Sequence, residues 1–300
     1  MTSVTKRNLR NGLLFTLPWS IGLGVFILYP VVSSFAFSFC DYSVLRPPVF
    51  IGLENYSDLI QDAVFWKSLW NTAIFALASI PLGMITAISM ALLLNNKVRG
   101  VVVYRTILFI PSLVPMVTLA MLWMWLFNGS YGIINYALDS LFAFLHLPFR
   151  APGWLLDPAW AKPALVIMSM WTCGHAMVIF LAGLQDIPVS LYESAEIDGA
   201  NAWHRTWNIT LPMLSPVIYF NMIMGIIGTF QVFAVPYIMT GGGPARATLF
   251  YAMYIYQLAF EDLRMGYACA MAVILFLIIV ALTWLATKST RRFIHYGGAA

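Results

Sequence analysis

The stretch LWNTAIFALASIPLGMITAISMALLL, residues 69–94, contains no charged side chain. As a helix it would rise roughly 39 Å, which exceeds the roughly 30 Å thickness of the hydrocarbon core of a bilayer. Backbone groups in lipid have to be hydrogen-bonded within their own segment, so we expect a helix in spite of the β-branched residues in this run. The stretch predicts an integral membrane protein.

The composition of the whole chain supports this prediction. Of its 300 residues, 61% are hydrophobic and only 9% are charged, whereas soluble globular proteins carry about 25% charged residues. Five further uncharged runs are long enough to cross a bilayer, namely Leu13–Phe39, Thr106–Phe127, Pro163–Leu184, Leu211–Thr240 and Met265–Thr287. We therefore predict an all-α protein with six transmembrane helices in which residues 1–300 form a single membrane domain. Several prolines are expected to mark kinks or helix ends, namely Pro18, Pro30, Pro81, Pro111 and Pro115.

The distribution of basic residues predicts the orientation of these spans. One side would hold both termini, the 95–105 link and the 185–210 link, with the basic residues Lys6, Arg7, Arg10, Lys97, Arg99, Arg105, Arg205, Lys288, Arg291 and Arg292. The other side would hold fewer, namely Arg46, Lys67, Arg150, Lys162, Arg246 and Arg264. Because Lys and Arg are enriched in cytoplasmic loops, we expect both termini in the cytoplasm.

Other classes of function are not supported. The net charge of +4 comes from basic residues beside apolar spans, so we expect membrane lipid and no nucleic acid as a partner. Cys40, Cys173 and Cys269 are widely spaced and odd in number, so neither a disulfide framework nor a metal site is indicated. The chain has no phosphate-binding loop and no hydrolase or metalloprotease motif, so we expect no catalytic residues, no cofactor and no ATP hydrolysis by this chain.

Polar and aromatic residues inside the spans are candidates for a solute pathway. Trp171 and His175 are one helical turn apart, and Asn221 and Gln231 lie in the fifth run. For any one of them, contact between helices is the commoner role; together they would suit a hydroxyl-rich solute. The spans contain no Asp, Glu, Lys or Arg, which disfavours an ion-coupled secondary carrier but leaves it as an alternative.

The link after the third run has helical periodicity. In Tyr131–Leu145, apolar residues fall on one stripe, which suits a helix lying in the membrane interface. The alternative is a loop helix packed on the bundle, and this is the arrangement that we expect.

The 185–210 link is unusually acidic, with Asp186, Glu193, Glu196 and Asp198 against one Arg. Its local pattern predicts a capping box from Ser190 to Glu193 at the start of a short helix. Gly199 would end that helix in the left-handed conformation, and a second helix would begin near Ala202. The acidity of a cytoplasmic link indicates a docking surface.

The segment YESAEIDGANAWHRTWNITLPMLSP, residues 192–216, resembles the EAA loop of membrane-spanning permease subunits of bacterial ABC importers. The matching residues are Glu193, Ser194, Ala195, Asp198, Gly199, Ala200, Ile209, Leu211, Pro212 and Pro216. Ser194 replaces the first Ala of the pattern, which a small helical position should tolerate. FIGLENYSDLI (50–60) and TGGGPARAT (240–248) are similar to segments of carbohydrate-type permeases related to the maltose and glycerol-3-phosphate systems.

This resemblance implies a function and a set of partners. The chain would be a permease subunit in the bacterial inner membrane, working with a second permease, two ATPase subunits that bind ATP and Mg, and an external solute-binding protein. It would move a sugar or oligosaccharide by alternating access, with 185–210 as the loop that couples it to the ATPase. The lack of cations in the spans favours a neutral saccharide, and glycerol phosphate or amino acids remain alternative solutes.

Overall fold

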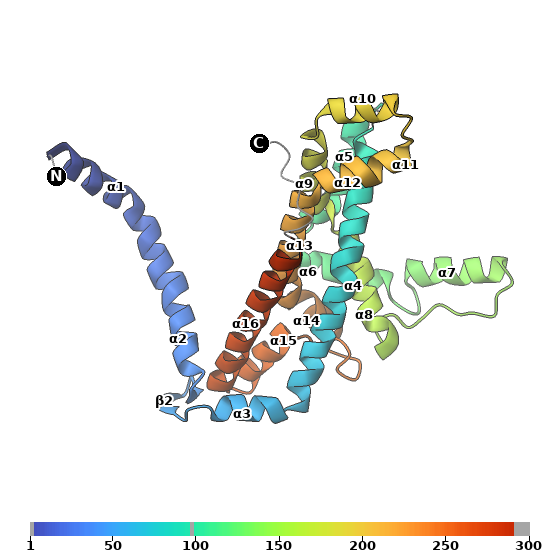
Figure 1. The fold of residues 1–300 in the computed structure, drawn as a ribbon. Coiled ribbons are helices and arrows are strands. Elements are labelled where there is room, and N and C mark those ends of the chain that lie inside the picture. Colours follow the sequence, from blue (N-terminus) through green and yellow to red (C-terminus); the bar gives the residue numbers. More distant parts are fainter. Residues whose placement is uncertain (1–2, 97–98, 291–300) are drawn as a thin grey trace. The chain divides into compact units, whose positions relative to one another are not determined.

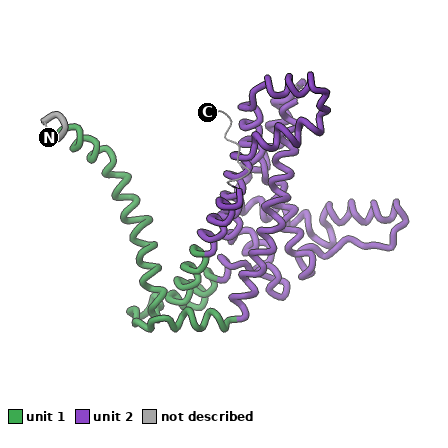
Figure 2. The backbone as a smooth tube through the Cα atoms, in the orientation of Figure 1, with its two compact units in different colours: residues 1–62, 255–277 green, residues 63–254, 278–300 purple. Residues whose placement is uncertain are grey.

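The computed structural model describes residues 3–96 and 99–290 (Figure 1). The chain is mostly helical and divides into two compact units, coloured separately in Figure 2. The first unit comprises the chain up to Asp62 together with Ile255–Leu277, and the second comprises Ala63–Tyr254 and the chain from Ile278 onward. Lys97, Arg291 and Arg292, on which the predicted orientation partly depends, lie outside the described residues.

The first unit begins with one long apolar helix. It consists of α1 (Ser3–Gly22), the π-helical segment η1 (Leu23–Leu28) and α2 (Tyr29–Phe37). Pro18 lies inside α1 and Pro30 lies in the first turn of α2, so neither proline ends the span. The unit continues with the strands β1 (Cys40–Ser43) and β2 (Arg46–Phe50) and with α3 (Glu54–Gln61), and it includes η4 (Gln257–Glu261) and the first turns of α16 (Met265–Thr290).

The two strands form an antiparallel hairpin, so the prediction of a purely helical chain was wrong at this point. Cys40 pairs with Phe50 and Ser43 with Arg46. The hairpin is fixed from α3, where the buried Asn55 amide donates hydrogen bonds to the carbonyl oxygens of Ser38 (2.9 Å) and Cys40 (3.0 Å). Gly266 of α16 approaches the start of β1 so closely that a Cβ on this glycine would lie 2.0 Å from the Cys40 carbonyl oxygen.

The second unit is built around the long helix α4 (Ala63–Leu94), which packs against α8 (Pro158–Trp171), α9 (Gly174–Gln185) and α13 (Ser215–Phe230). Its other elements are α5 (Val101–Phe109), η2 (Ile110–Leu113), α6 (Met116–Leu126), α7 (Ile133–Phe144), α10 (Val189–Ile197), α11 (Ala202–Arg205), η3 (Thr206–Thr210), α12 (Leu211–Met213), α14 (Ala234–Thr240) and most of α15 (Tyr251–Tyr256).

Three helical stretches of the described chain are long and apolar enough to cross a bilayer, namely Arg7–Phe37, Ala63–Leu94 and Met265–Thr290. Three further pairs qualify only if each bent pair is one span. They are Val101–Leu113 with Met116–Leu126 (98°), Pro158–Trp171 with Gly174–Gln185 (46°), and Ala202–Met213 with Ser215–Phe230 (64°). The described chain therefore has between three and six candidate spans.

The bends correct three predicted spans. The run 163–184 is not one helix, because α8 ends at Trp171 and α9 begins at Gly174 with a bend of 46° between them. The run 106–127 is not one straight helix, because Pro111 lies in a 3₁₀ turn and Pro115 starts a new helix. The run 211–240 is not one helix either: helix already begins at Ala202, bends at Leu214 and ends at Phe230, and α14 follows separately. Proline lacks a backbone N–H and clashes with the preceding turn, so closely spaced prolines break the helical ladder.

Two buried clusters hold the second unit together. The first core cluster joins α4, α6, α8 and α14 and is centred on Phe75, Trp123, Phe127, Leu165 and Phe250. The second core cluster joins α4, α9 and the chain around Leu214, with Ala87, Ala91, Met177, Phe180 and Leu184 at its centre. Large aromatic residues contribute to the first cluster, whereas small or aliphatic residues dominate the second.

A buried asparagine on α4 fastens the loop between α14 and α15. The Asn71 amide donates to the carbonyl oxygens of Arg246 (2.8 Å) and Leu249 (3.0 Å). One helical position further, the Thr72 hydroxyl accepts from the Tyr251 N–H (2.9 Å). Ala245 and Arg246 both have positive φ, which is unfavourable for residues with a Cβ, so this loop depends on contacts from α4 to keep its shape.

We predict that Asn71→Ala loosens residues 240–250. The substitution removes the only donor shown for two loop carbonyls within the described residues, at a cost of about 1–3 kcal/mol per orphaned buried group. Hydrogen exchange followed by mass spectrometry on the purified chain in detergent should then show faster exchange in this loop. Asn96→Ala is the matched control, because that exposed amide bonds only to carbonyls of its own helix. Equal exchange in both variants would contradict the role of Asn71.

Candidate functional site

The predicted docking segment folds as two short helices at one end of α4, which we call the surface helix pair: α10, α11 and the turn between them (Figure 1). The turn is formed as predicted by Gly199, which has a φ of 77°. The Ala200 N–H donates to the Ala195 carbonyl (2.9 Å) and the Gly199 N–H donates to the Glu196 carbonyl (3.1 Å). These two bonds define a Schellman motif, in which a left-handed glycine ends the helix and reverses the chain.

The start of α10 differs from the prediction. The helix begins at Val189, after Pro188 at the N-cap position, and no side chain caps it among the described residues. Ser190 therefore lies inside the first turn, and the predicted capping box from Ser190 to Glu193 was wrong. Since proline already has a helical φ and no N–H to satisfy, it can occupy the start of a helix without a capping side chain. Glu193 is free of that structural role and is exposed.

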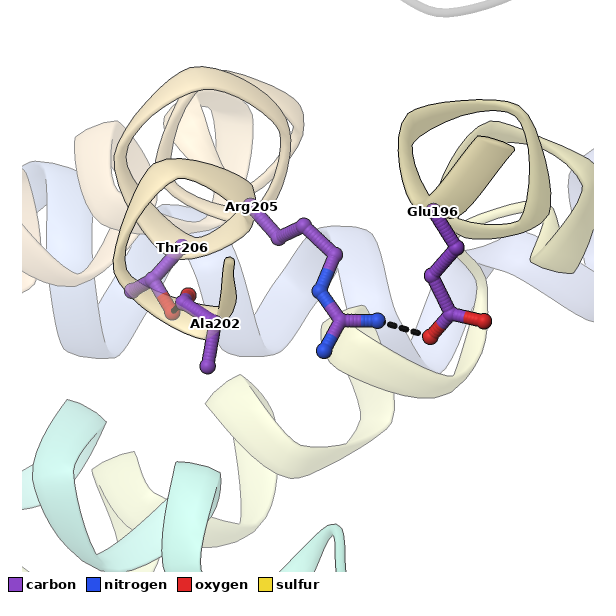
Figure 3. A network of polar contacts seen from close by, with 4 residues as sticks. All are labelled: Glu196, Ala202, Arg205 and Thr206. Atoms are coloured by element: carbon purple, nitrogen blue, oxygen red, sulfur yellow. Dashed lines mark hydrogen bonds and ion pairs between the residues drawn. The ribbon is translucent and has the colours of Figure 1, made fainter. Parts of the chain in front are cut away.

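An ion pair joins the two helices of the pair. The Arg205 guanidinium of α11 donates to the Glu196 carboxylate of α10, as Figure 3 shows. The start of α11 is fixed by Asn201, whose side-chain oxygen accepts from the His204 N–H (2.9 Å), and its end by Thr206, whose hydroxyl donates to the Ala202 carbonyl (2.9 Å). Glu196 is thus engaged within the chain, and the two helices have a fixed mutual orientation.

The surface helix pair is attached to the second core cluster. The hydroxyl groups of Tyr192 on α10 and Thr210 in η3 lie 3.0 Å apart and form a hydrogen bond. Tyr192 and Ile209 also pack against the second core cluster, and Ile187 is part of it. The contacts run from α10 and η3 to α4 and α9, so the surface helix pair is tied to the second core cluster.

The outward surface of the helix pair combines acidic and apolar side chains. Glu193, Ser194 and Asp198 are exposed, Ala195 and Ala200 are half-buried, and Pro212 is half-buried at the start of α12. Ile197 is 87% exposed, and Trp203 and Trp207 are also exposed with ring centroids 5.4 Å apart. The outward surface therefore presents carboxylates, the exposed aliphatic side chain of Ile197 and two exposed indole rings.

A cavity of about 430 Å³ lies between the membrane helices of the second unit. Its polar lining comes from hydroxyl, imidazole and amide groups, namely Ser79, Ser112, Ser169, Thr172, His175, Asn221 and Thr229, and no residue of the lining is Asp, Glu, Lys or Arg. The buried Ser79 hydroxyl has no hydrogen-bond partner among the described residues. The cavity therefore offers hydroxyl, amide and imidazole groups to a solute.

Of the four residues predicted for the pathway, two line this cavity. His175 and Asn221 belong to its lining, whereas Trp171 and Gln231 do not. Trp171 packs edge-on against Trp123 (5.8 Å between ring centroids), and Gln231 follows the end of α13. The hydroxyls of Ser79, Ser112, Ser169 and Thr172 were missed because such residues are common in membrane helices and no sequence spacing distinguished them. The sequence shows Arg205 as the one Lys or Arg of the acidic link, but it does not indicate that Glu196 is its ion-pair partner.

Comparison with known proteins identifies the family. Residues 79–295 match the family model described as "Binding-protein-dependent transport system inner membrane component". The sulfoquinovosyl glycerol transport system permease protein SmoG of Agrobacterium fabrum is 36% identical over 89% of this chain and 85% of that protein. The lactose transport system permease protein LacF of Rhizobium radiobacter is 36% identical over 94% of each chain.

The fold has a solved counterpart. A bacterial ABC transporter involved in the import of the acidic polysaccharide alginate contains a chain that superimposes with a TM-score of 0.82 at 23% identity, covering 98% of this chain and all of that one. The chain therefore belongs to the family of inner membrane components of binding-protein-dependent transport systems, and it is a transport subunit, not an enzyme.

Proposed function

We propose that this chain is one of two permease subunits of an ATP-driven importer that moves a sugar or oligosaccharide across the bacterial inner membrane. The observation that carries this is the surface helix pair, in which Glu193, Ser194, Asp198 and Gly199 of the EAA pattern are exposed on a compact unit attached to the membrane helices. The partners would be a second, different permease, two ATPase subunits that hold ATP and Mg, and an external binding protein. Two relatives, the lactose permease LacF and the sulfoquinovosyl glycerol permease SmoG, support a carbohydrate as the solute.

The same proposal fixes the topology. Each bent helix pair counts as one span, which gives six spans, both termini in the cytoplasm and residues 1–300 as one permease domain. The 185–210 loop then faces the cytoplasm and α10 is the coupling helix, seated in a cleft of the ATPase. Breaks within spans are tolerated where the freed backbone lines a cavity, which supports the counting of bent pairs as single spans.

The coupling path follows the chain from the surface to the cavity. The surface helix pair leads through η3 and α12 directly into α13, and Asn221, Gly225 and Thr229 of α13 line the cavity. The Tyr192–Thr210 hydrogen bond ties α10 to this same path. ATPase closure would move the pair as a rigid body and tilt α13 with it, so that the cavity opens to alternate sides of the membrane.

The chemistry of the cavity points to a neutral saccharide. Hydroxyl and amide groups pair well with sugar hydroxyls, and the lining has no Lys or Arg to neutralise a sulfonated or carboxylated sugar. A charge for such a solute would have to come from the second permease. Trp171 and Gln231 would contribute only where the partner permease completes the pathway.

We predict that the binding protein encoded beside this chain retains a neutral mono- or oligosaccharide after purification. Mass spectrometry of the released ligand identifies it, and uptake of that ligand into proteoliposomes should require both permeases, the binding protein and an active ATPase. Uptake by this chain alone along an ion gradient would contradict the proposal. A retained amino acid would leave the importer assignment in place and reject the saccharide.

We predict that Gly199→Pro and Glu193→Lys uncouple uptake from ATP hydrolysis. Gly199 has a φ of 77°, which proline cannot adopt, and a strain of about 1.4 kcal/mol already corresponds to a tenfold change in an equilibrium. Uptake should fall at least tenfold while ATPase activity persists and the chain stays in the membrane. Glu193→Lys reverses an exposed charge on the proposed docking face and should lower assembly with the ATPase in pull-down.

Gly100→Pro is the matched control for the turn. Gly100 also has a positive φ, and a Cβ at either glycine would meet no atom within 4 Å, but Gly100 lies outside the 185–210 loop. Equal loss of coupling in the two proline variants would show that the effect is not specific to the surface helix pair.

We predict that the Glu196–Arg205 ion pair positions α10 on α11. Glu196→Arg and Arg205→Glu alone should each reduce coupled uptake, by no more than about fivefold because a partly exposed pair contributes roughly 0.2–1 kcal/mol. The double variant re-forms the pair with reversed charges and should recover uptake per ATP hydrolysed. If Glu196 instead contacts the ATPase, the double variant will be as defective as Glu196→Arg.

A further inference from the structure

Helix α7 lies in the connection between two membrane helices. It begins seven residues after α6 ends at Leu126 and precedes α8, which begins at Pro158. Its 12 residues would extend about 18 Å, too short to cross a bilayer. If α6 and α8 belong to neighbouring spans, as proposed above, this connection has to run at the membrane surface.

The polar side of α7 is held by the chain itself. The buried Asn135 side-chain oxygen accepts from the Trp154 indole N–H (2.6 Å), and its amide donates to the Pro152 carbonyl (3.3 Å). One turn further, the Asp139 carboxylate accepts from the Ala151 N–H (2.8 Å). The segment 150–154 thus runs along the polar side and fixes the rotation of the helix about its axis.

Only part of the apolar side of α7 packs against other residues of the described chain. Ile134 and Leu138 pack against the first core cluster. The neighbouring stripe is exposed, with Ile133 at 55%, Leu141 at 48% and Phe144 at 78% of their surface. The stripe repeats at intervals of eight and three residues and so follows one face of the helix. A loop helix packed on the bundle, as the sequence led us to expect, would have buried this face.

The position of α7 and the exposed residues around it indicate where the helix lies. Figures 1 and 2 show the helix projecting away from the other helices of its unit. The exposed large apolar residues in the second half of α6 are Met121 (60%), Leu122 (41%), Met124 (36%) and Trp125 (51%); the exposed Tyr131 (67%) precedes α7 and Tyr136 (76%) lies in its first turn. Trp and Tyr are enriched where a membrane helix meets the headgroup region. On the proposed topology, these aromatic residues mark the headgroup level at which α7 begins.

We propose that α7 lies in the membrane interface on the external side, with the stripe Ile133–Leu141–Phe144 inserted among the acyl chains. A bilayer is the occupant that fits, because the only charged residue within the helix, Asp139, points to the chain's own backbone and α7 presents no Lys or Arg. Binding is hydrophobic and independent of the charge of the lipid. The helix fixes the depth and rotation of α6 and α8, which carry part of the cavity lining.

Spin labels on the assembled transporter in proteoliposomes test this proposal. Cys40, Cys173 and Cys269 are first replaced by Ser, and single cysteines are introduced as Leu141→Cys, Phe144→Cys and Ala143→Cys. Ala143 is exposed but nearly opposite Leu141 on the helix, which makes it the matched control. Labels at 141 and 144 should be several-fold more accessible to oxygen than to a water-soluble nickel complex, at a depth of about 5–10 Å. The label at 143 should show the reverse.

Two results would overturn the proposal. Nickel accessibility at 141 and 144 equal to that at 143 would place the stripe in water. Shielding of 141 and 144 from both reagents would mean that the second permease or the binding protein covers the helix. The inference rests on the proposed topology, so Met121→Cys on α6 separates the two failures: a water-accessible label there would refute the span, whereas a lipid-exposed label there together with water at 141 would refute only the placement of α7.

Discussion

The absence of water inside a bilayer is the constraint on which the rest of this structure depends. Each backbone N–H and C=O there needs a partner within the protein, so any break in a helix has to be compensated. In this chain the breaks at Pro111–Val114 and at Thr172–Cys173 both line the cavity. Their freed carbonyls are partly satisfied by neighbouring hydroxyls, since Ser112 donates to Phe109 (2.6 Å) and Thr172 to Ser169 (3.0 Å). The cavity lies where the helices are interrupted.

The two breaks also contact each other. Gly174, at the start of α9, approaches the end of α5 so closely that a Cβ there would lie 2.9 Å from the Ser112 hydroxyl and 3.1 Å from the Leu108 carbonyl oxygen. Small residues that let backbones approach are a common means of helix association in membranes. The polar groups of the lining therefore have a structural role as well as a chemical one, and only some, such as the Ser79 hydroxyl, have hydrogen-bonding capacity that the described chain leaves unused.

Sequence reasoning recovered the features that depend on local chemistry. Length and lack of charge identified the helical stretches, and Gly199 was assigned to the left-handed position that it occupies. Sequence reasoning failed where contacts with other segments of the chain determine the local structure. Pro47 and Pro48 argue against a strand because they cannot donate to a ladder, yet β2 forms because it pairs along only one edge with β1. Asn71 and Asn55 hold loops through hydrogen bonds to residues distant in the sequence, and no spacing pattern predicts such partners.

The acidic residues of the 185–210 link have different surroundings and therefore different roles. Glu196 is neutralised by Arg205 within the helix pair, so it stiffens the unit, whereas Glu193 and Asp198 have no ion-pair partner within 4 Å among the described residues. A surface that keeps carboxylates unpaired beside the exposed Ile197 is suited to a partner that supplies both a cation and an apolar pocket. A rigid unit transmits a displacement without absorbing it. Within the described chain, the Glu196–Arg205 ion pair therefore holds the two helices together, and the carboxylates of Glu193 and Asp198 stay exposed beside it.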